Sequence, residues 1–306
     1  MNRKYFALIS LLIILTFIGY IIIDTVSDKD NAASQDESAV LPEYPDMWQI
    51  SAVIPDAVDQ LTSVAVDDNG LIFCGGNMNV TCFGTGLKKK WSIPVSGKVM
   101  ALAVYNDTVF ASLTEHILLL STEGRMLSDW GPYELNSIIT SISVNKYFAA
   151  FADAGCKRIF ILKKSGEVHS MIGQGDRKFI IPSPYFDVAL SGRDTVYIAD
   201  TGKRRIETWT TDGRFIDAFG EPGLAPEAFC GCCNPSHFTV ISQGFITAEK
   251  GMNRIKITDR KGRFIEFVSS VNNFTAAIPL DIASSDGKTV YAANPSDSKI
   301  YIFTRK

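Results

Sequence analysis

Residues 194–220 read DTVYIADTGKRRIETWTTDGRFIDAFG and contain three short β-rich runs separated by two glycine turns. Apolar and polar residues alternate in these runs, and Thr201-Gly202 and Asp212-Gly213 separate them. Alternation with a period of about two, interrupted by such dipeptides, is typical of antiparallel hairpins. The stretch therefore predicts three consecutive strands of one antiparallel sheet.

The strand that precedes this stretch starts with a phrase that recurs along the chain. The six occurrences are Ser63–Val66, Ala101–Val104, Ser141–Val144, Asp187–Leu190, Phe238–Ile241 and Asp281–Ser284. Their starts are 38, 40, 46, 51 and 43 residues apart. A period in the forties with short strands is typical of β-propeller blades, each a four-stranded sheet. The sequence thus predicts an all-β, six-bladed β-propeller.

The sixth repeat reaches the end of the chain one strand short. Its third strand is Ile300–Phe303, and no outer strand follows. An apolar segment before the first repeat, Trp48–Ile54, can supply the missing strand. Pairing the two segments would close the ring and remove an open sheet edge.

These residues resemble the NHL-repeat family of six-bladed propellers. The best matches are the Ala-Asp-Thr-Gly-x-x-Arg-Ile phrase at Ala199–Ile206 and the Phe-Gly-x-x-Gly phrase at Phe219–Gly223. The resemblance covers roughly Gln60 to Lys306, and its motif is degenerate in blades one, two and six. It implies the NHL-like fold and a tendency to bind partners on the faces of the ring, and it implies no particular activity.

An uncharged segment of 19 residues, Tyr5–Ile23, lies near the start of the chain, after Arg3 and Lys4. A helix of that length can span a bilayer, and the basic residues favour a cytoplasmic N-terminus. A cleaved signal peptide is the alternative, but its apolar core is usually shorter and is followed by a small-residue cleavage site. We therefore expect a single-pass membrane protein with its propeller in the periplasm or outside the cell.

The sequence accordingly divides into three parts: a transmembrane anchor at 1–24, a flexible acidic linker at 25–46 and the propeller at 47–306. The linker is polar and lacks periodicity, which is typical of a tether. The net charge of −3 does not indicate the basic surface that is needed to bind nucleic acid. We expect no nucleic-acid partner.

The longest interval between repeats contains a cysteine-rich loop with Cys230, Cys232, Cys233 and His237. Three thiolates and an imidazole can form a complete set of soft ligands, so zinc, copper or an iron–sulfur centre are the candidate cofactors. Disulfides are the alternative, because an extracytoplasmic compartment is oxidising. Cys74 and Cys82 flank a predicted hairpin turn and are a candidate disulfide pair.

Basic residues recur at equivalent turns of neighbouring blades. Lys203, Arg204, Lys250 and Arg254 are predicted to lie on the same face as the cysteine loop, where they can bind a protein or a small anionic partner. Ordinary solvated turns are the alternative interpretation.

The sequence best supports a membrane-tethered binding or scaffold module that acts through one face of the ring. A redox or metal-binding module built on the Cys230–His237 loop is the second interpretation. A metal-dependent hydrolase or lyase is the third, and it is less favoured because the chain has only three histidines. No catalytic residue is assigned, and the pattern favours a non-enzymatic role.

Overall fold

The computed structural model describes residues 10, 12–20, 44, 47–270, 274–275 and 278–306. The chain separates into two compact units, Met1–Tyr44 and Pro45–Lys306. In the first unit, residues 10 and 12–20 are helical. No helix within the described residues is both long enough and apolar enough to cross a membrane. Much of the predicted anchor, and the predicted linker except residue 44, lie outside the described residues.

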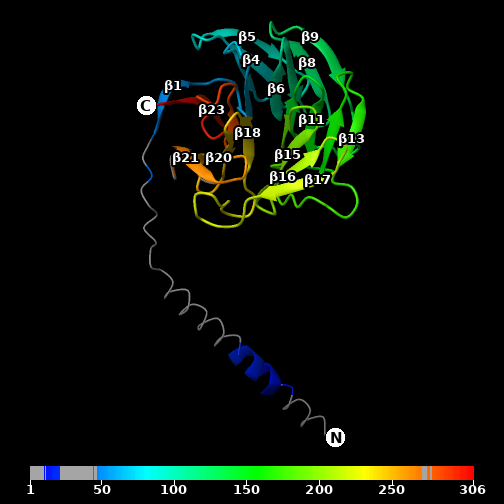
Figure 1. Ribbon diagram of the computed structural model, residues 1–306, viewed down its shortest axis with the longest axis vertical. Helices are drawn as coiled ribbons and strands as arrows, with labels where there is room; N and C mark the ends of the chain where they lie inside the picture. The colour runs from blue at the N-terminus through cyan, green and yellow to red at the C-terminus, as the bar shows by residue number, and fades with distance from the viewer. Residues whose placement is uncertain (1–9, 11, 21–43, 45–46, 271–273, 276–277) are drawn as a thin grey trace. The chain divides into compact units, whose positions relative to one another are not determined.

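The second unit consists of antiparallel four-stranded sheets arranged as the blades of a propeller (Figure 1). Blades one to three contain β2 (Ser63–Val66), β3 (Ile72–Gly75), β4 (Asn79–Phe83), β5 (Lys89–Pro94), β6 (Ala101–Tyr105), β7 (Thr108–Ser112), β8 (Ile117–Ser121), β9 (Met126–Trp130), β10 (Ile139–Val144), β11 (Ala149–Asp153), β12 (Arg158–Leu162) and β13 (Val168–Ile172). Blades four to six contain β14 (Asp187–Ser191), β15 (Thr195–Asp200), β16 (Arg205–Thr210), β17 (Phe215–Phe219), β18 (His237–Ile241), β19 (Gly244–Ala248), β20 (Ile255–Asp259), β21 (Phe264–Ser269), β22 (Asp281–Ala283), β23 (Thr289–Asn294), β24 (Lys299–Arg305) and β1 (Trp48–Ile54).

The predicted six-bladed propeller is confirmed. Each recurring phrase forms the inner strand of a blade: β2, β6, β10, β14, β18 and β22. Blade six has the strand order β1-β24-β23-β22, and its register runs from Trp48 opposite Arg305 to Ile54 opposite Ile300. The N-terminal strand therefore closes the ring as predicted.

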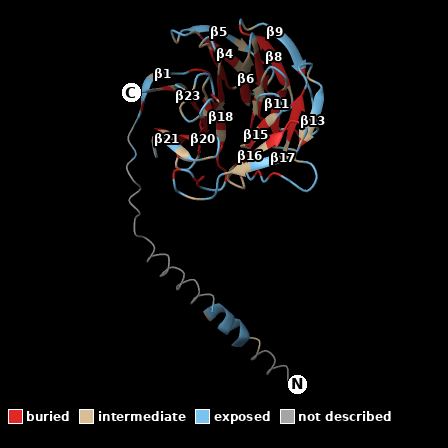
Figure 2. Cartoon of the chain, viewed as in Figure 1, coloured by how far each residue is buried: buried red, intermediate tan, exposed pale blue. Residues whose placement is uncertain are grey.

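The hydrophobic core lies between the blades. The buried side chains form clusters, each of which joins the facing sheets of two neighbouring blades. Between blades four and five, for example, Ile206 packs in one cluster with Phe229, Phe238 and Phe245. Figure 2 shows this burial in the strands of the interior. In the middle strands, the side chains on both faces of the sheet are buried, because each blade is packed between two others.

The predicted pairing of Cys74 with Cys82 does not form, and both residues are free cysteines. Cys74 lies opposite Thr81, whereas Cys82 lies opposite Phe73. The two thiols therefore point to opposite faces of the sheet, since side chains alternate along a strand. Cys74 packs against blade six and Cys82 against blade two.

Candidate functional site at the channel mouth

All inner strands begin at the same end of the propeller, which we call the top face. Because strands within a blade are antiparallel, the connection into each inner strand and the turn between the second and third strands of a blade share this end. The top face therefore consists of the connections 55–62, 95–100, 131–138, 173–186, 220–236 and the described part of 270–280, and of the turns 76–78, 113–116, 154–157, 201–204, 249–254 and 295–298.

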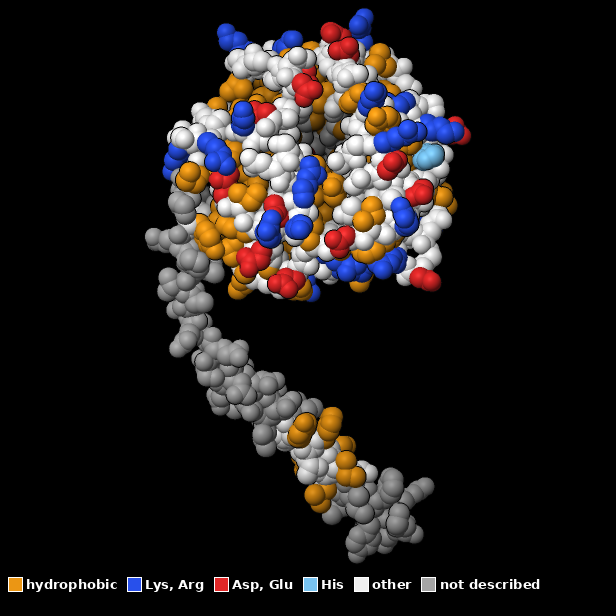
Figure 3. Space-filling view, viewed as in Figure 1, with side chains coloured by type: hydrophobic (Ala, Val, Ile, Leu, Met, Phe, Trp, Pro, Cys, Tyr) orange, Lys and Arg blue, Asp and Glu red, His pale blue; other side chains and the backbone are white. Residues whose placement is uncertain are grey.

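The inner strands surround a central channel with a cavity of about 280 Å³. Figure 3 shows one face of the propeller, hollowed near its centre. All six inner strands line the cavity, and much of its wall consists of valine, alanine and leucine side chains. The ionisable residues that line this cavity are Asp187, His237 and Asp281, each the first residue of an inner strand. They come from blades four, five and six and lie at the top of the channel.

His237 lies between the two carboxylates. Its Nδ1 atom is 3.7 Å from Asp187 Oδ2 and 3.5 Å from Asp281 Oδ1. Burial raises the pKa of Asp187, although the charge of His237 opposes that shift. Burial likewise raises the pKa of Asp281 to about 6, again opposed by His237. The channel mouth therefore holds a carboxyl group that exchanges protons close to neutral pH.

The sequence interpretation named His237 but grouped it with the cysteines. It missed Asp187 and Asp281 as its partners. A signal for both was present, because both acidic residues occupy the first position of the recurring phrase. That position starts the inner strand of each of these two blades, and it lies at the top of one channel once the ring is closed.

The connection 220–236 passes beside this mouth and is held from beneath by buried charges. The side chains of Glu249, Arg254 and Lys256 are almost completely buried. Arg254 Nε donates to Glu249 Oε1 at 2.6 Å, and Lys256 Nζ lies 3.0 Å from the same oxygen. Burial lowers the pKa of Lys256 to about 8, although the charge of Glu249 opposes that shift.

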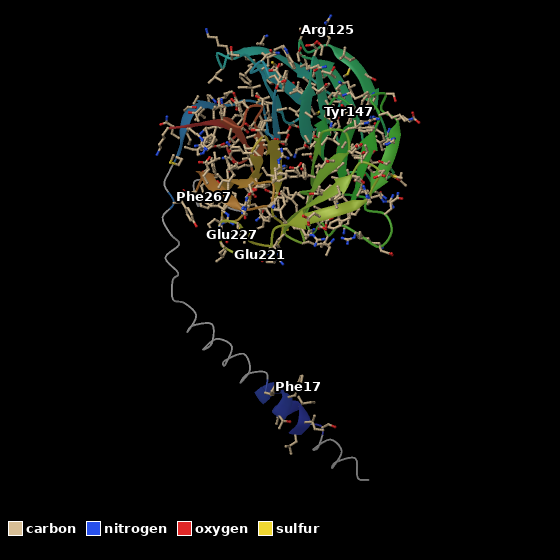
Figure 4. All side chains as sticks on the ribbon, viewed as in Figure 1. Phe17, Arg125, Tyr147, Glu221, Glu227 and Phe267 are labelled. Atoms are coloured by element: carbon tan, nitrogen blue, oxygen red, sulfur yellow. The ribbon has the colours of Figure 1, made fainter. Side chains whose placement is uncertain are left out.

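This ion cluster binds the backbone of the loop directly. Arg254 donates to the carbonyl oxygens of Leu224 at 3.0 Å and Ala228 at 2.6 Å. Lys256 Nζ donates to the same Ala228 oxygen at 2.6 Å. In return, Glu249 Oε2 accepts the N–H of Cys230 at 3.0 Å. The loop, which carries the labelled Glu221 and Glu227 in Figure 4, is thereby fixed on the top face.

The predicted basic surface is only partly exposed. Arg254 is 1% exposed and is committed to the loop carbonyls, so it is not available to a partner. Lys203 Nζ pairs with Asp200 Oδ2 at 2.6 Å and donates to the Lys178 carbonyl oxygen at 2.8 Å.

Arg204 and Lys250 are the two predicted basic residues that lie beside the cysteine loop. Arg204 Nη1 donates to the Gly231 carbonyl oxygen at 3.2 Å. The Lys250 ammonium lies over the ring of Tyr185, 4.7 Å from its centroid. The half-buried Tyr185 ring in turn packs edge-on against His237.

The predicted metal ligands do not converge. Cys232 Sγ lies 3.0 Å from Cys233 Sγ, whereas Cys230 Sγ contacts the Lys250 carbonyl and the Asn234 amide. His237 is turned to the channel carboxylates instead. Within the part of the chain that the structure describes, no three His, Cys, Asp or Glu side chains are arranged to hold a metal ion. The described site thus offers a cysteine pair and, separately, a histidine–carboxylate group.

Exposed aliphatic side chains are unevenly distributed between the two faces. Among the described residues, exposed large hydrophobic side chains on the top face are Met78, Leu135, Ile138, Ile180 and Leu224. On the bottom face, where the remaining hairpin turns lie, the exposed large hydrophobic side chains outside the strands are Tyr147 and Met47, which directly precedes β1. The top-face residues come from one turn and from connections of several blades, so they do not form one local loop feature.

No known protein-family model matches the chain, and no curated protein matches its sequence. Several solved structures share its fold. The WD40 β-propeller domain of Doa1 matches with a TM-score of 0.57 and 13% identity over 80% of this chain and 79% of that chain. Virginiamycin B lyase from Staphylococcus aureus matches with a TM-score of 0.56 and 16% identity over 86% and 99%. A streptogramin B lyase matches with a TM-score of 0.56 and 14% identity over 85% and 97%. These likenesses establish the propeller fold.

Proposed function

We propose that this chain is a membrane-tethered binding module that receives a protein partner on the top face of its propeller. The observation that supports it is the difference between the two faces. Among the described residues, five exposed apolar side chains project from the connections and turns of the top face, against Met47 and Tyr147 on the bottom face. Propellers commonly act as scaffolds, and a surface with spaced apolar side chains is suited to docking.

The charges near the channel mouth indicate the chemistry of the partner. Lys250 and Arg204 both contact the connection 220–236, which also carries the exposed Leu224. A partner that presents apolar side chains flanked by acidic groups would complement this surface. Apolar contacts would supply most of the affinity, and the charges would mainly guide approach and orientation.

Site-specific crosslinking in the intact cell tests the proposal. A photoreactive amino acid would replace Leu224 or Ile180 in the full-length chain, and it would replace Ile216 or Ile265 in matched controls. All four side chains are exposed, but the control positions lie on the outer strands β17 and β21. We expect one defined adduct from the top-face positions and none from the outer strands.

A second pair of variants checks that the adduct reflects binding. Leu224→Ser with Ile180→Ser should weaken capture by about tenfold or more, because two apolar contacts of an interface are lost. Ile216→Ser with Ile265→Ser should leave capture unchanged. Equal adducts from all four positions, or no adduct from the top face, would argue against a top-face partner.

The tether is supported by the charge pattern around Tyr5–Ile23 rather than by the described helix. We propose that the segment remains on the mature protein and that the propeller lies outside the cytoplasm. Intact-mass measurement of the membrane-extracted protein should include residues 1–24. Added protease should reach the propeller in right-side-out vesicles. A mature chain that begins after the apolar segment would refute the tether.

A lyase-type enzyme is a second candidate, favoured by the His237–carboxylate group that opens into the channel cavity. Structures with this fold include lyases named for virginiamycin B and streptogramin B. Incubation of the full-length protein with virginiamycin B tests it, with His237→Ala as the matched control. Loss of the antibiotic in the wild type but not the variant would support it, and unchanged antibiotic in both would exclude this substrate.

A further inference from the structure

Two adjacent cysteines in the connection 220–236 differ sharply in exposure. Cys232 is exposed, whereas Cys233 is 2% exposed. Their Sγ atoms are nevertheless only 3.0 Å apart. One thiol is therefore open to an incoming molecule, and the second is within reach of the first but shielded from that molecule.

The backbone around the pair is fixed by Asn234. Its side-chain Nδ2 donates to the carbonyl oxygens of Cys230 at 2.6 Å and Lys250 at 2.9 Å. Its Oδ1 accepts the N–H of Lys250 at 2.9 Å. The Asn234 side chain thus joins the cysteine loop to the turn 249–254 and keeps Lys250 beside the cysteines.

The surroundings give the two thiols different acidities. A hydrogen bond from Cys233 lowers the pKa of Cys232, and the charges of Lys250 and Arg204 lower it further. Burial raises the pKa of Cys233, against a hydrogen bond from Ser183. The thiolate therefore forms preferentially on the exposed sulfur, which is the sulfur that can act as a nucleophile.

The other cysteines lack this combination. Cys74, Cys82 and Cys230 are buried, and Cys156 is half-buried with a pKa that burial raises. Within the described residues, the exposed, charge-supported thiol with a sulfur neighbour is Cys232.

We propose that Cys232 and Cys233 form a redox-active pair that exchanges with disulfides brought to the top face. The Cys232 thiolate attacks one sulfur of a disulfide R–S–S–R′, which breaks the S–S bond and releases R′–S⁻. The Cys233 thiol then loses its proton and attacks Cys232 Sγ, which releases R–S⁻. The cysteine pair is oxidised to a disulfide between adjacent residues, the substrate is reduced to two thiols, and two protons pass from the pair to the released thiolates. This activity goes beyond the proposed binding function.

The test follows the reduced full-length protein in detergent after addition of glutathione disulfide, with rapid alkylation and mass spectrometry. Wild type should lose two hydrogens, and peptide mapping should locate the new bond at Cys232–Cys233. Cys233→Ser should instead accumulate glutathione on Cys232, because the second step is blocked. Cys232→Ser should do neither, and Cys156→Ser should behave as wild type.

A second arm replaces glutathione disulfide with insulin, whose disulfides are borne by a protein. Oxidation of the pair in both arms would show a general disulfide substrate, and oxidation in one arm would assign the substrate to small or to protein disulfides. The proposal is overturned if Cys232→Ser reacts like wild type. It is equally overturned if neither disulfide oxidises the pair.

A third measurement reports the role of the neighbouring charge without any substrate. The rate of Cys232 alkylation at neutral pH should fall by about threefold in Lys250→Gln, because a nearby cation favours the thiolate. Lys98→Gln, a charge change on the connection 95–100, serves as the matched control and should leave that rate unchanged. Equal rates in Lys250→Gln and wild type would contradict the assigned role of Lys250.

Discussion

The carboxylate of Asp187, on the inner strand of blade four, accepts the backbone N–H of Phe238, on the inner strand of blade five, at 2.7 Å. Inner strands of neighbouring blades are not paired in one sheet, so this bond joins two blades across the channel wall. Asp281 makes the equivalent contact from blade six to blade one, where it accepts the Val64 N–H at 2.8 Å. The two carboxylates therefore help to hold the ring together as well as lining its mouth.

Asp281→Asn should change the pH dependence of stability. The folded-state pKa of Asp281 is raised from 3.8 to about 6, so the folded protein binds more protons than the unfolded chain between these values. Its stability contribution is therefore largest at low pH and is lost as the pH rises through about 6. The free energy of unfolding of wild type, relative to Asp281→Asn, should rise as the pH falls from 7 to about 4. Denaturant titrations across that range measure it.

Asp286→Asn is the control, and it should change the pH dependence of stability in the opposite direction. Partial burial of Asp286 is outweighed by hydrogen bonds from Thr289 and Lys288, and the pKa of this carboxyl is lowered. The contribution of the Asp286 carboxylate to stability should be present above the ordinary pKa of aspartate and should be lost as the pH falls below it. Parallel pH profiles for the two variants would show that Asp281 does not carry a raised pKa.

Arg254→Met should loosen the connection 220–236, because it removes donors from the Leu224 and Ala228 carbonyl oxygens and takes one partner from Glu249. Breaking a buried charged contact of this kind costs about 3 kcal/mol. Limited proteolysis should cut the variant inside 220–236 at protease levels that leave wild type intact. Lys250→Gln, on the same turn but half-exposed, should resist protease like wild type. Equal resistance of both variants would mean that Arg254 does not hold the loop.

Trp48→Ala should open the closure of blade six. Trp48 is 1% exposed and packs with Val268 and Phe303, so it joins the N-terminal strand to blades five and six. Truncation of a buried tryptophan costs about 3–5 kcal/mol. Val53→Ala, on the same strand but 38% exposed, should cost under about 1 kcal/mol. Thermal denaturation of both variants measures the difference, and similar losses would refute a special role for Trp48.

The ring could be predicted from the sequence because each inner strand repeats one short phrase and many of the hairpins have a glycine in the turn. Closure by Trp48–Ile54 was predictable for the same reason, since a repeat lacking one strand needs a partner. The register in which neighbouring strands pair could not be predicted from the repeat pattern. A shift of one position across β3 and β4 decides whether Cys74 and Cys82 face each other, and composition does not specify that shift.

The role of Arg254 was also missed, because a basic residue at a turn is usually solvated. A signal for it lies in the position of Glu249. The equivalent residues in blades three and four, Asp153 and Asp200, accept the N–H of Ile138 and Ile180 from the preceding connection. Glu249 makes the same contact to Cys230 with a longer side chain and also reaches Arg254. The repeat thus predicts the backbone contact, whereas the buried ion cluster depends on the tertiary packing of the longest loop.

Lys256→Met should flatten the response of stability to alkaline pH. Burial lowers the pKa of Lys256 from 10.5 to about 8 in the folded protein. Between these values the unfolded chain carries the extra proton, so the stability of wild type rises as the pH increases through this range. The variant lacks this group, and its Arg254 still binds both Glu249 and the Ala228 carbonyl oxygen. The free energy of unfolding of wild type minus that of the variant should therefore increase by up to about 3 kcal/mol between pH 8 and 10.5. Taking the difference cancels the titration of groups common to both proteins. A difference that stays constant, or that decreases with pH, would show that Lys256 is not penalised by its burial beneath the loop.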